Sequence, residues 1–190
     1  IPDPELGESR VQMFNSVFFF DTKGELRLTY DKMIPLPFGE YLPWGLGWLN
    51  NYVNGIGDFR AGTEPLVYPS QAGTMATPIC YEAIFGRICR QFPDLEILVN
   101  VTNDAWFGDT AAPHLHGMLA ALRATELGVP MIRSAYSGIS FIVEPHGHMY
   151  AETEPFTEVA RIVTVRNKRF DTPYRRWGDW FPWLCVLLAA

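Results

Sequence analysis

The chain has 190 residues and a formal net charge of -6, and 48% of its residues are hydrophobic and 14% aromatic. This length is that of one ordinary domain or a large piece of one, and the apolar content argues against a disordered chain. The acidic balance, with no block of Lys and Arg, argues against a nucleic-acid partner.

The first residues, IPDPELGESR, are typical of a polar loop that leads into a strand. The chain starts at Ile1 without an initiator Met or a signal peptide, so we expect another segment to precede it. The following stretch, SVFFFDTKGELRLTYD, predicts two strands joined by a turn at Lys23 and Gly24.

A loop punctuated by Pro and Gly, YDKMIPLPFGEYLPW, follows the second predicted strand and carries Lys32 and Glu40. A lysine beside carboxylates stays protonated and can stabilise an oxyanion, and a carboxylate can act as a general base. These two residues are therefore candidates for a catalytic site. Lys32 by itself is also typical of a solvated loop.

The next stretch, YLPWGLGWLNNYVNGIGDFRAG, crowds Trp44, Leu46, Trp48, Leu49 and Tyr52 into a loop rich in Gly and Pro. Such an apolar loop predicts a flap that faces a membrane, and we interpret Trp44 and Trp48 as substrate contacts. The alternative is a loop folded over the core.

The stretch TPICYEAIFG places Cys80 between a predicted strand, GTMATPI, and a predicted helix, EAIFGRICRQF. At such a strand-to-helix turn, backbone N–H groups and the helix dipole favour the thiolate over the thiol. Cys80 is thus a candidate nucleophile, and a buried inert cysteine is the alternative. A thiol that attacks an acyl carbon also needs a base, a positive group and an acid, for which Lys32, Glu40 and Glu82 are candidates.

The other cysteines predict no further chemistry, whereas the four histidines, in PHLH and PHGH, leave a Cys-His pair open as an alternative source of the base. Three cysteines without paired metal-type spacing favour neither a disulfide framework nor a zinc site. Cys89 and Cys185 are interpreted as packing residues. His114 and His116 are two residues apart and would not share a helix face, so we expect no metal there.

The rest of the chain predicts alternating strands and helices. EILVNVT has the continuous apolar run of a buried strand, and PHLHGMLAALRATELG has apolar residues at helical spacing and ends at Gly128. PMIRSAY, ISFIVEP, HMYAE and ARIVTV predict four successive strands. The fold class is therefore α/β with a mixed sheet.

The C-terminal run, WFPWLCVLLAA, is apolar but has only about half of the ~20 residues that a membrane-spanning helix needs. We interpret it as the start of a membrane helix, with Trp177, Trp180 and Trp183 at the boundary between lipid and water. The alternative is a buried amphipathic helix.

Five of these stretches together resemble the nitrilase, or carbon-nitrogen hydrolase, superfamily, and within it the apolipoprotein N-acyltransferases. They are YDKMIPLPFGEYLPW, PICYE, LVNVTNDAWFGD, HLHGMLAALRATELGVPMIRSAYSGIS and TPYRRWGDW, and they run through nearly the whole chain. The resemblance implies an αββα sandwich whose N-terminal part is missing. Residues 1–179 would be the C-terminal portion of a carbon-nitrogen hydrolase domain and residues 180–190 the start of a transmembrane helix.

The resemblance also implies residue roles. Cys80 matches the nucleophile and Lys32 the lysine of a Glu-Lys-Cys triad, while Glu40 and Glu82 match accessory acidic residues. Tyr81 would help to shape the pocket. Trp106 matches a tryptophan near the active site, although an aromatic core plug is the alternative. The general-base glutamate has no match after Ile1, so we expect it upstream and expect the fragment alone to be inactive.

The implied reaction is acyl transfer from a membrane phospholipid, through a thioester on the cysteine, to the α-amino group of the N-terminal diacylglyceryl-cysteine of a lipoprotein. No cofactor is implied, because the thioester carries the activated acyl group. The implied location is the bacterial inner membrane, with the catalytic domain on the periplasmic side. A soluble nitrilase-type amidase acting on a small amide is the alternative, and a degenerate domain that only binds lipid or a partner is a second one.

Overall fold

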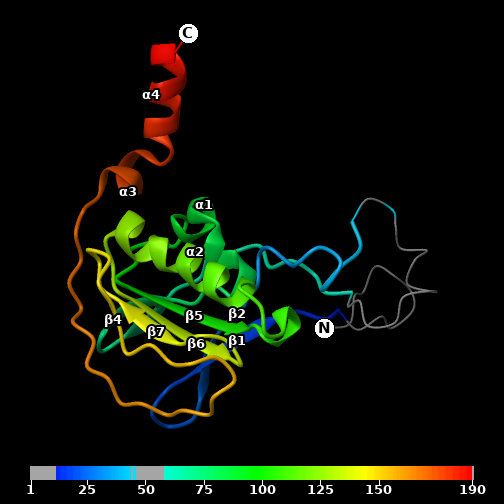
Figure 1. Ribbon diagram of the computed structural model, residues 1–190. Helices are drawn as coiled ribbons and strands as arrows, with labels where there is room; N and C mark the ends of the chain where they lie inside the picture. The colour runs from blue at the N-terminus through cyan, green and yellow to red at the C-terminus, as the bar shows by residue number, and fades with distance from the viewer. Residues whose placement is uncertain (1–11, 44, 46–57, 190) are drawn as a thin grey trace. The chain divides into compact units, whose positions relative to one another are not determined.

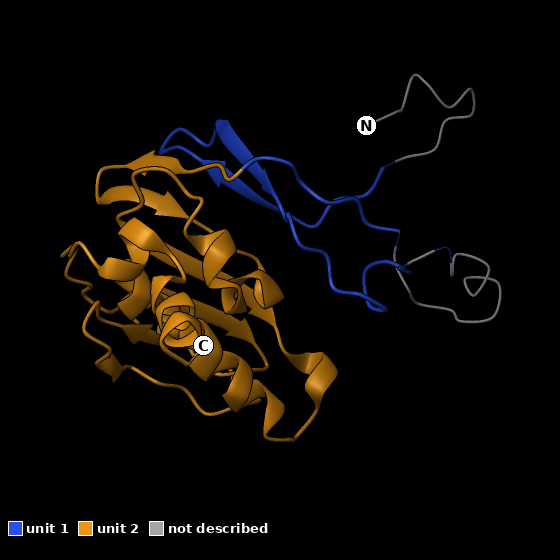
Figure 2. Ribbon diagram, turned by 90° about the horizontal axis from the view of Figure 1, so that it is seen from above, with its two compact units in different colours: residues 1–64 blue, residues 65–190 orange. Residues whose placement is uncertain are grey.

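The computed structural model describes residues 12–43, 45 and 58–189. The chain divides into two compact units, residues 1–64 and residues 65–190, which are drawn in different colours in Figure 2. The predicted N-terminal loop and the predicted flap residues Trp44 and Trp48 lie outside the described residues.

The first unit contains an antiparallel hairpin of β1 (Ser16–Phe20) and β2 (Leu26–Asp31). Its turn is closed by the Asp21 carboxylate, which accepts hydrogen bonds from the backbone N–H groups of Lys23 at 2.8 Å and Glu25 at 3.0 Å. Gly24 occupies the left-handed position of this turn, with φ +78°. The predicted hairpin is confirmed.

The second unit is built on a six-stranded sheet. Its strands are β3 (Tyr68–Ser70), β4 (Gly73–Ala76), β5 (Ile97–Asn103), β6 (Met131–Tyr136), β7 (Phe141–Val143) and β8 (Met149–Tyr150), hydrogen-bonded in that order. The pairs β4–β5 and β5–β6 are parallel, and the other pairs are antiparallel. The mixed sheet predicted from the sequence is confirmed, and the carboxyl ends of its parallel strands lie at one edge.

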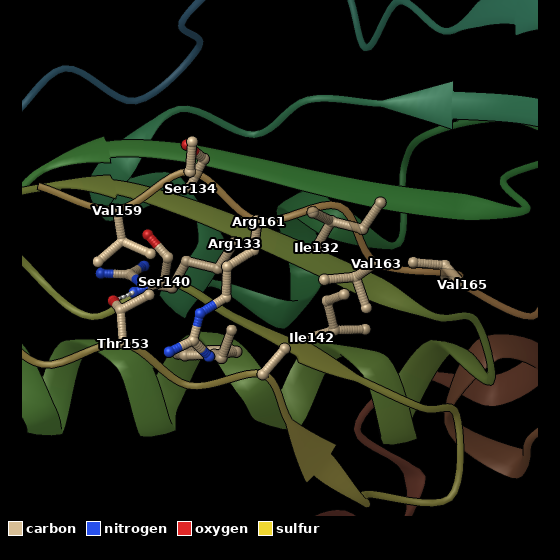
Figure 3. Close-up of a pocket in the computed structure, with 13 residues that line it drawn as sticks. Ile132, Arg133, Ser134, Ser140, Ile142, Thr153, Val159, Arg161, Val163 and Val165 are labelled. Atoms are coloured by element: carbon tan, nitrogen blue, oxygen red, sulfur yellow. Dashed lines mark hydrogen bonds between the residues drawn. The ribbon is translucent and has the colours of Figure 1, made fainter.

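The predicted fourth strand of the second half, ARIVTV, is not a strand in the structure. Hydrogen bonds from side chains hold this segment, in place of the backbone hydrogen bonds of a strand. Arg161 donates to the carbonyl of Glu152 at 3.0 Å, and the Tyr150 hydroxyl donates to the carbonyl of Thr164 at 3.3 Å. Figure 3 shows Val163 beside Ile142 in the pocket that the segment and the sheet line together. Val163 and Val165, which are partly buried, therefore line a pocket over the sheet face without joining its edge, whereas Ile162 is exposed.

The helix α2 (Ala112–Leu127) lies along one face of the sheet (Figure 1). It ends at Gly128, which has the left-handed φ of 64° expected for a helix C-terminus. The predicted helix and its C-terminal glycine are confirmed.

The orientation of α2 differs from that of an ordinary amphipathic helix. Its buried face consists of Pro113, His116, Gly117, Ala120, Arg123, Ala124 and Leu127. Its apolar residues Leu115, Met118, Leu119 and Leu122 are exposed. Small residues on the buried face let the helix approach the sheet closely, since a Cβ on Gly117 would lie 3.1 Å from the Phe141 ring. The packing side of α2 is therefore set by small and hydrogen-bonding residues.

The chain ends in two further helices, α3 (Pro173–Trp177) and α4 (Trp180–Ala189). No side chain of α4 is buried, so the alternative of a buried C-terminal helix is wrong. Within the described residues, every helix is too short or too polar to cross a membrane, and the predicted start of a membrane helix is not confirmed. Cys185 is exposed, so its interpretation as a packing residue is also wrong.

The packing side of α2 gives a first prediction. Leu127 is 2% exposed and Leu122 is 52% exposed, although they lie on the same helix. We expect Leu127→Ala to lower the free energy of unfolding by about 3 kcal/mol and Leu122→Ala to change it by less than about 0.5 kcal/mol. Denaturant unfolding of both variants measures this difference, and equal losses would contradict the observed orientation.

Candidate active site

Cys80 lies just beyond the carboxyl edge of the parallel strands, where a segment that follows β4 turns into a short helix. Ile79 forms an isolated parallel bridge with Val101 of β5, which keeps the chain extended up to the cysteine. Cys80 then begins the 3₁₀ helix η2 (Cys80–Ile84) with φ +50°. A left-handed conformation at a residue other than Gly is strained, and such strain is concentrated at functional sites.

The helix predicted after Cys80 is shorter and more broken than expected. The chain leaves η2 at Phe85, where the backbone is extended, and then forms the four-residue helix α1 (Gly86–Cys89). A single 3₁₀ turn carries a much smaller dipole than a long α-helix. The expected support of a thiolate by a helix dipole is therefore weaker than the sequence suggested.

Glu82 fixes the turn on the N-terminal side of the cysteine. Its side chain is fully buried, and its Oε2 atom accepts a hydrogen bond from the backbone N–H of Ile79 at 2.7 Å. In this capping interaction, the side chain of the third helical residue binds the backbone N–H of the residue that precedes the helix. Tyr81 packs edge-on against Phe85, with ring centroids 4.8 Å apart. Both residues therefore shape the backbone around Cys80.

A second buried side chain near Cys80 is that of Asn100, which lies in β5 and is fully buried. Its Nδ2 atom donates to the carbonyl oxygens of Pro78 at 2.8 Å and Cys80 at 3.4 Å. Its Oδ1 atom accepts a short hydrogen bond from Arg133 of β6. The resemblance placed Arg133 in the stretch RSAYSGIS, behind the site, but assigned it no orientation, and no role was predicted for Asn100, although a polar side chain inside the buried run EILVNVT was a signal that could have found it.

Arg133 belongs to a buried cluster of charged and polar groups. It donates to Asp104 Oδ2 at 2.7 Å, while Asp104 Oδ1 lies 2.9 Å from His116 Nδ1 and accepts from the Thr102 hydroxyl at 3.0 Å. Burial raises the pKa of the Asp104 carboxyl, but its hydrogen bonds and the charge of Arg133 outweigh this, so that the pKa lies below its usual value. Gly138 makes room for the cluster, because a Cβ there would lie 2.2 Å from Asp104 Oδ2.

The first unit contains the other predicted pair. Lys32 follows β2 directly, is 1% exposed, and donates from Nζ to Glu40 Oε2 at 2.8 Å. Glu40 also accepts hydrogen bonds from the backbone N–H of Leu36 and the side chain of Asn15, both at 2.6 Å. Burial raises the pKa of Glu40, but Lys32 and these donors lower it further, to a value below the usual one. The reading of Lys32 as a solvated loop lysine is wrong.

The predicted site residues thus fall into two groups. Cys80, Tyr81 and Glu82 come together in the second unit, and Lys32 pairs with Glu40 in the first. Trp106 lies in the short helix η3 (Ala105–Phe107) and is 78% exposed, so it is not a core plug. Cys89 is confirmed as a packing residue, since it is fully buried and burial raises the pKa of its thiol to about 12.

Among the described residues, no group of three or more His, Cys, Asp or Glu side chains is arranged to hold a metal ion. His116 instead points Nδ1 into the Asp104 cluster. The groups at Cys80 are suited to nucleophilic chemistry: a partly exposed cysteine, a backbone turn held by Glu82, and a buried Asn100 that contacts the Cys80 carbonyl and binds Arg133.

Comparison with known proteins places the chain in a family. Residues 4–172 match the family described as carbon-nitrogen hydrolase, and the chain belongs to this family. A mutant of the amidase from Nesterenkonia AN1, of the nitrilase superfamily, superposes with a TM-score of 0.53 over 74% of this chain and 52% of that one. At 22% identity this likeness shows the fold alone. The nitrilase-like α/β fold predicted from the sequence is confirmed.

Curated relatives at higher identity are apolipoprotein N-acyltransferases. The relative from Geobacter metallireducens is 36% identical over 193 residues, which cover 100% of this chain and 37% of the relative. The relative from Bradyrhizobium diazoefficiens is 38% identical over 196 residues, which cover 100% of this chain and 36% of the relative. The predicted resemblance is thus confirmed, and the chain spans little more than a third of the length of these relatives.

The buried pair in the first unit predicts a pH dependence. Because the pKa of Glu40 is lowered in the folded state, its stabilising effect is complete above the usual value of 4.5 and is lost as the pH falls through the folded value. We expect Glu40→Gln, which leaves Lys32 buried without a counter-charge, to cost about 3 kcal/mol at neutral pH. The loss should shrink as the solution is acidified below pH 4.5.

Stability curves against pH for the wild-type protein and Glu40→Gln measure this effect. Glu64→Gln is the control, because Glu64 is an exposed carboxylate of the same unit. A Glu40→Gln curve that stays parallel to the wild-type curve down to pH 3 or so would contradict the assignment.

The strain at Cys80 gives a separate prediction. Because φ is +50° there, we expect Cys80→Gly to be more stable than Cys80→Ala by about 1 kcal/mol, although both variants lack the thiol. Cys89 is the matched control, since it lies in a helix and Gly there should be less stable than Ala by about 1 kcal/mol. Denaturant unfolding measures these stabilities. If Ala is more stable than Gly at position 80, as it is expected to be at position 89, Cys80 is not strained.

Proposed function

We propose that Cys80 is the nucleophile of an acyltransferase that forms a thioester with a fatty acyl chain. The observation that carries this proposal is the strained, partly exposed cysteine at the carboxyl edge of the parallel strands, in a chain whose curated relatives are apolipoprotein N-acyltransferases. The donor is a membrane phospholipid, and the acceptor is the α-amino group of the N-terminal diacylglyceryl-cysteine of a lipoprotein. The names of those relatives support N-acylation of a lipoprotein. The phospholipid donor and the diacylglyceryl-cysteine acceptor are what the resemblance of the sequence implies.

The first step forms a bond between Cys80 Sγ and the acyl carbon of the phospholipid ester. The carbon–oxygen bond of the ester then breaks, and the lysophospholipid leaves with the proton that the thiol gave up. In the second step the amine attacks the thioester, an amide forms, and the thiol is regenerated. The atoms balance without an oxidant, a reductant or a cofactor.

Lys32 has the properties of an oxyanion stabiliser in this reaction. It is a buried cation whose position is set by Glu40, which in turn is held by Leu36 and Asn15. A preorganised charge of this kind stabilises a tetrahedral intermediate without having to reorganise as the reaction proceeds. Glu40 thus supports Lys32, and Glu82 supports the backbone before Cys80. We propose that the general-base glutamate that the resemblance implies lies upstream of Ile1.

Exposed apolar surface supports a lipid substrate. The outer face of α2 presents leucine and methionine side chains, and α4 presents an apolar surface with none of its side chains buried. Trp177, Trp180 and Trp183 lie at the start of this C-terminal part and are all exposed, as expected for indole rings at a lipid boundary.

We propose that residues 1–179 are part of the carbon-nitrogen hydrolase domain and that residues 180–190 begin a membrane helix. The domain would then lie on the periplasmic side of the bacterial inner membrane, with Trp106, Tyr81 and the flap residues Trp44 and Trp48 near the substrate.

The proposal predicts a covalent intermediate on Cys80. Incubation of the full-length protein in membranes with phospholipid, but without an acceptor, should add the mass of a long-chain acyl group to the peptide that contains Cys80. Neutral hydroxylamine should remove this mass, because it cleaves thioesters. Cys80→Ser should show no hydroxylamine-sensitive adduct, whereas Cys89→Ser, which changes a buried cysteine, should still acylate.

Two outcomes would contradict the proposal. A folded protein that never acquires the adduct from phospholipid is not a phospholipid acyltransferase. An adduct that appears only with a small amide, and that water removes, would favour a nitrilase-type amidase instead.

A further inference from the structure

The orientation of the Asn100 amide follows from the chemistry of its neighbour. A guanidinium group can only donate hydrogen bonds, so the atom of Asn100 that faces Arg133 must be the carbonyl oxygen Oδ1. The amide nitrogen Nδ2 then necessarily faces the carbonyl oxygens of Pro78 and Cys80, which can only accept. Arg133 therefore selects one of the two orientations of the Asn100 side chain, and it is the one that binds the backbone of the nucleophile.

Arg133 is itself fixed on several sides. It donates to Asp104 Oδ2 at 2.7 Å and to the carbonyl of Ile139 at 3.3 Å, and its guanidinium lies 5.8 Å from the centre of the Phe141 ring. Its side chain is 0% exposed, and so is that of Asp104. A planar cation with this many partners has no alternative position in the same cavity.

Two buried side chains thus hold the backbone around Cys80. Glu82 binds the N–H of Ile79, the residue before the cysteine, and Asn100 binds the carbonyl of Cys80 itself. A left-handed conformation at a cysteine persists only where the surroundings determine it. The side chain of Cys80 therefore depends on this hydrogen-bond network for its direction.

We infer that Asn100 and Arg133 are positioning residues for the nucleophile: Arg133 orients the Asn100 amide, and the amide holds Cys80 in the strained conformation that presents its thiol. This inference rests on the proposed role of Cys80, and it assigns two residues that touch neither the acyl group nor the acceptor.

The charge of Arg133 is maintained in this position. Burial lowers the pKa of its guanidinium, while Asp104 and Cys80 oppose that change. An arginine remains protonated at neutral pH under these conditions.

Asn100→Asp tests the inference most directly. The carboxylate keeps the shape of the side chain and still accepts from Arg133, but it has no N–H to give to the carbonyls of Pro78 and Cys80. We expect the turnover number kcat for acyl-enzyme formation, and the rate of Cys80 alkylation by iodoacetamide at pH 7, to fall at least about tenfold. The KM for phospholipid should stay near the wild-type value, because Asn100 does not contact substrate.

The matched control is Asn167→Asp. Asn167 is exposed and also donates from Nδ2 to a backbone carbonyl, that of Ala72, at 2.6 Å. The chemical change and the type of hydrogen bond lost are the same, but Cys80 is not involved. This variant should leave both rates unchanged. A purely structural role for Asn100 would loosen the fold and make Cys80 alkylation faster, whereas loss of positioning makes it slower.

Arg133→Lys is the second variant, which keeps the buried charge beside Asp104 but replaces the planar fork by a single ammonium group. We expect a smaller fall than for Asn100→Asp in kcat and in alkylation, with KM again unchanged. If Asn100→Asp does not fold, Arg133→Lys decides the question. Wild-type rates in a folded Asn100→Asp, or in Arg133→Lys where only that variant folds, would overturn the inference.

The alkylation measurement separates this inference from the proposed function. A wild-type protein that forms no acyl adduct, but whose Cys80 alkylation depends on Asn100 and Arg133, would overturn the proposed substrate and leave the positioning role intact. A wild-type protein that forms the adduct, with Asn100→Asp forming it equally fast, would support the function and overturn the positioning role.

Discussion

The buried ion pair of Arg133 and Asp104 is the interaction on which the surroundings of Cys80 depend. It joins the end of β5 to β6, positions His116 of α2 through Asp104, and orients Asn100 toward the cysteine. Burying two charges is costly, so such a pair adds little net stability, although removing one partner leaves the other uncompensated and costs about 3–5 kcal/mol. The pair fixes the position of Arg133, and through Arg133 the orientation of the Asn100 amide.

Much of the fold could be predicted from sequence patterns, because local chemistry determines it. The hairpin of β1 and β2, the buried strand β5 and the C-terminal glycine of α2 were all visible in periodicity and turn residues. The packing side of α2 was not visible, because it depends on where His116 and Arg123 find hydrogen-bond partners in the folded chain. Periodicity also could not show that ARIVTV lies over the sheet without pairing with it, since apolar residues can face the sheet in either arrangement.

The candidate site was predictable in part for a similar reason. Cys80, Glu82, Lys32 and Glu40 belong to short motifs that a resemblance can match residue by residue. Asn100 and Arg133 lie 33 positions apart in the chain. They come into contact only because β5 and β6 pair side by side. The left-handed backbone at Cys80 likewise follows from the turn between β4 and η2, and cysteine itself gives no sign of it.

We propose that the reaction of Cys80 depends on Lys32. The most direct measurement is the rate at which the full-length protein forms the acyl adduct on Cys80 when Lys32 is changed to Met, compared with the same change at the exposed turn residue Lys23. We predict that Lys32→Met slows adduct formation by about 100-fold, as removal of one oxyanion-stabilising group does, while Lys23→Met has no effect. Equal rates in a folded Lys32→Met and the wild-type protein would contradict the claim.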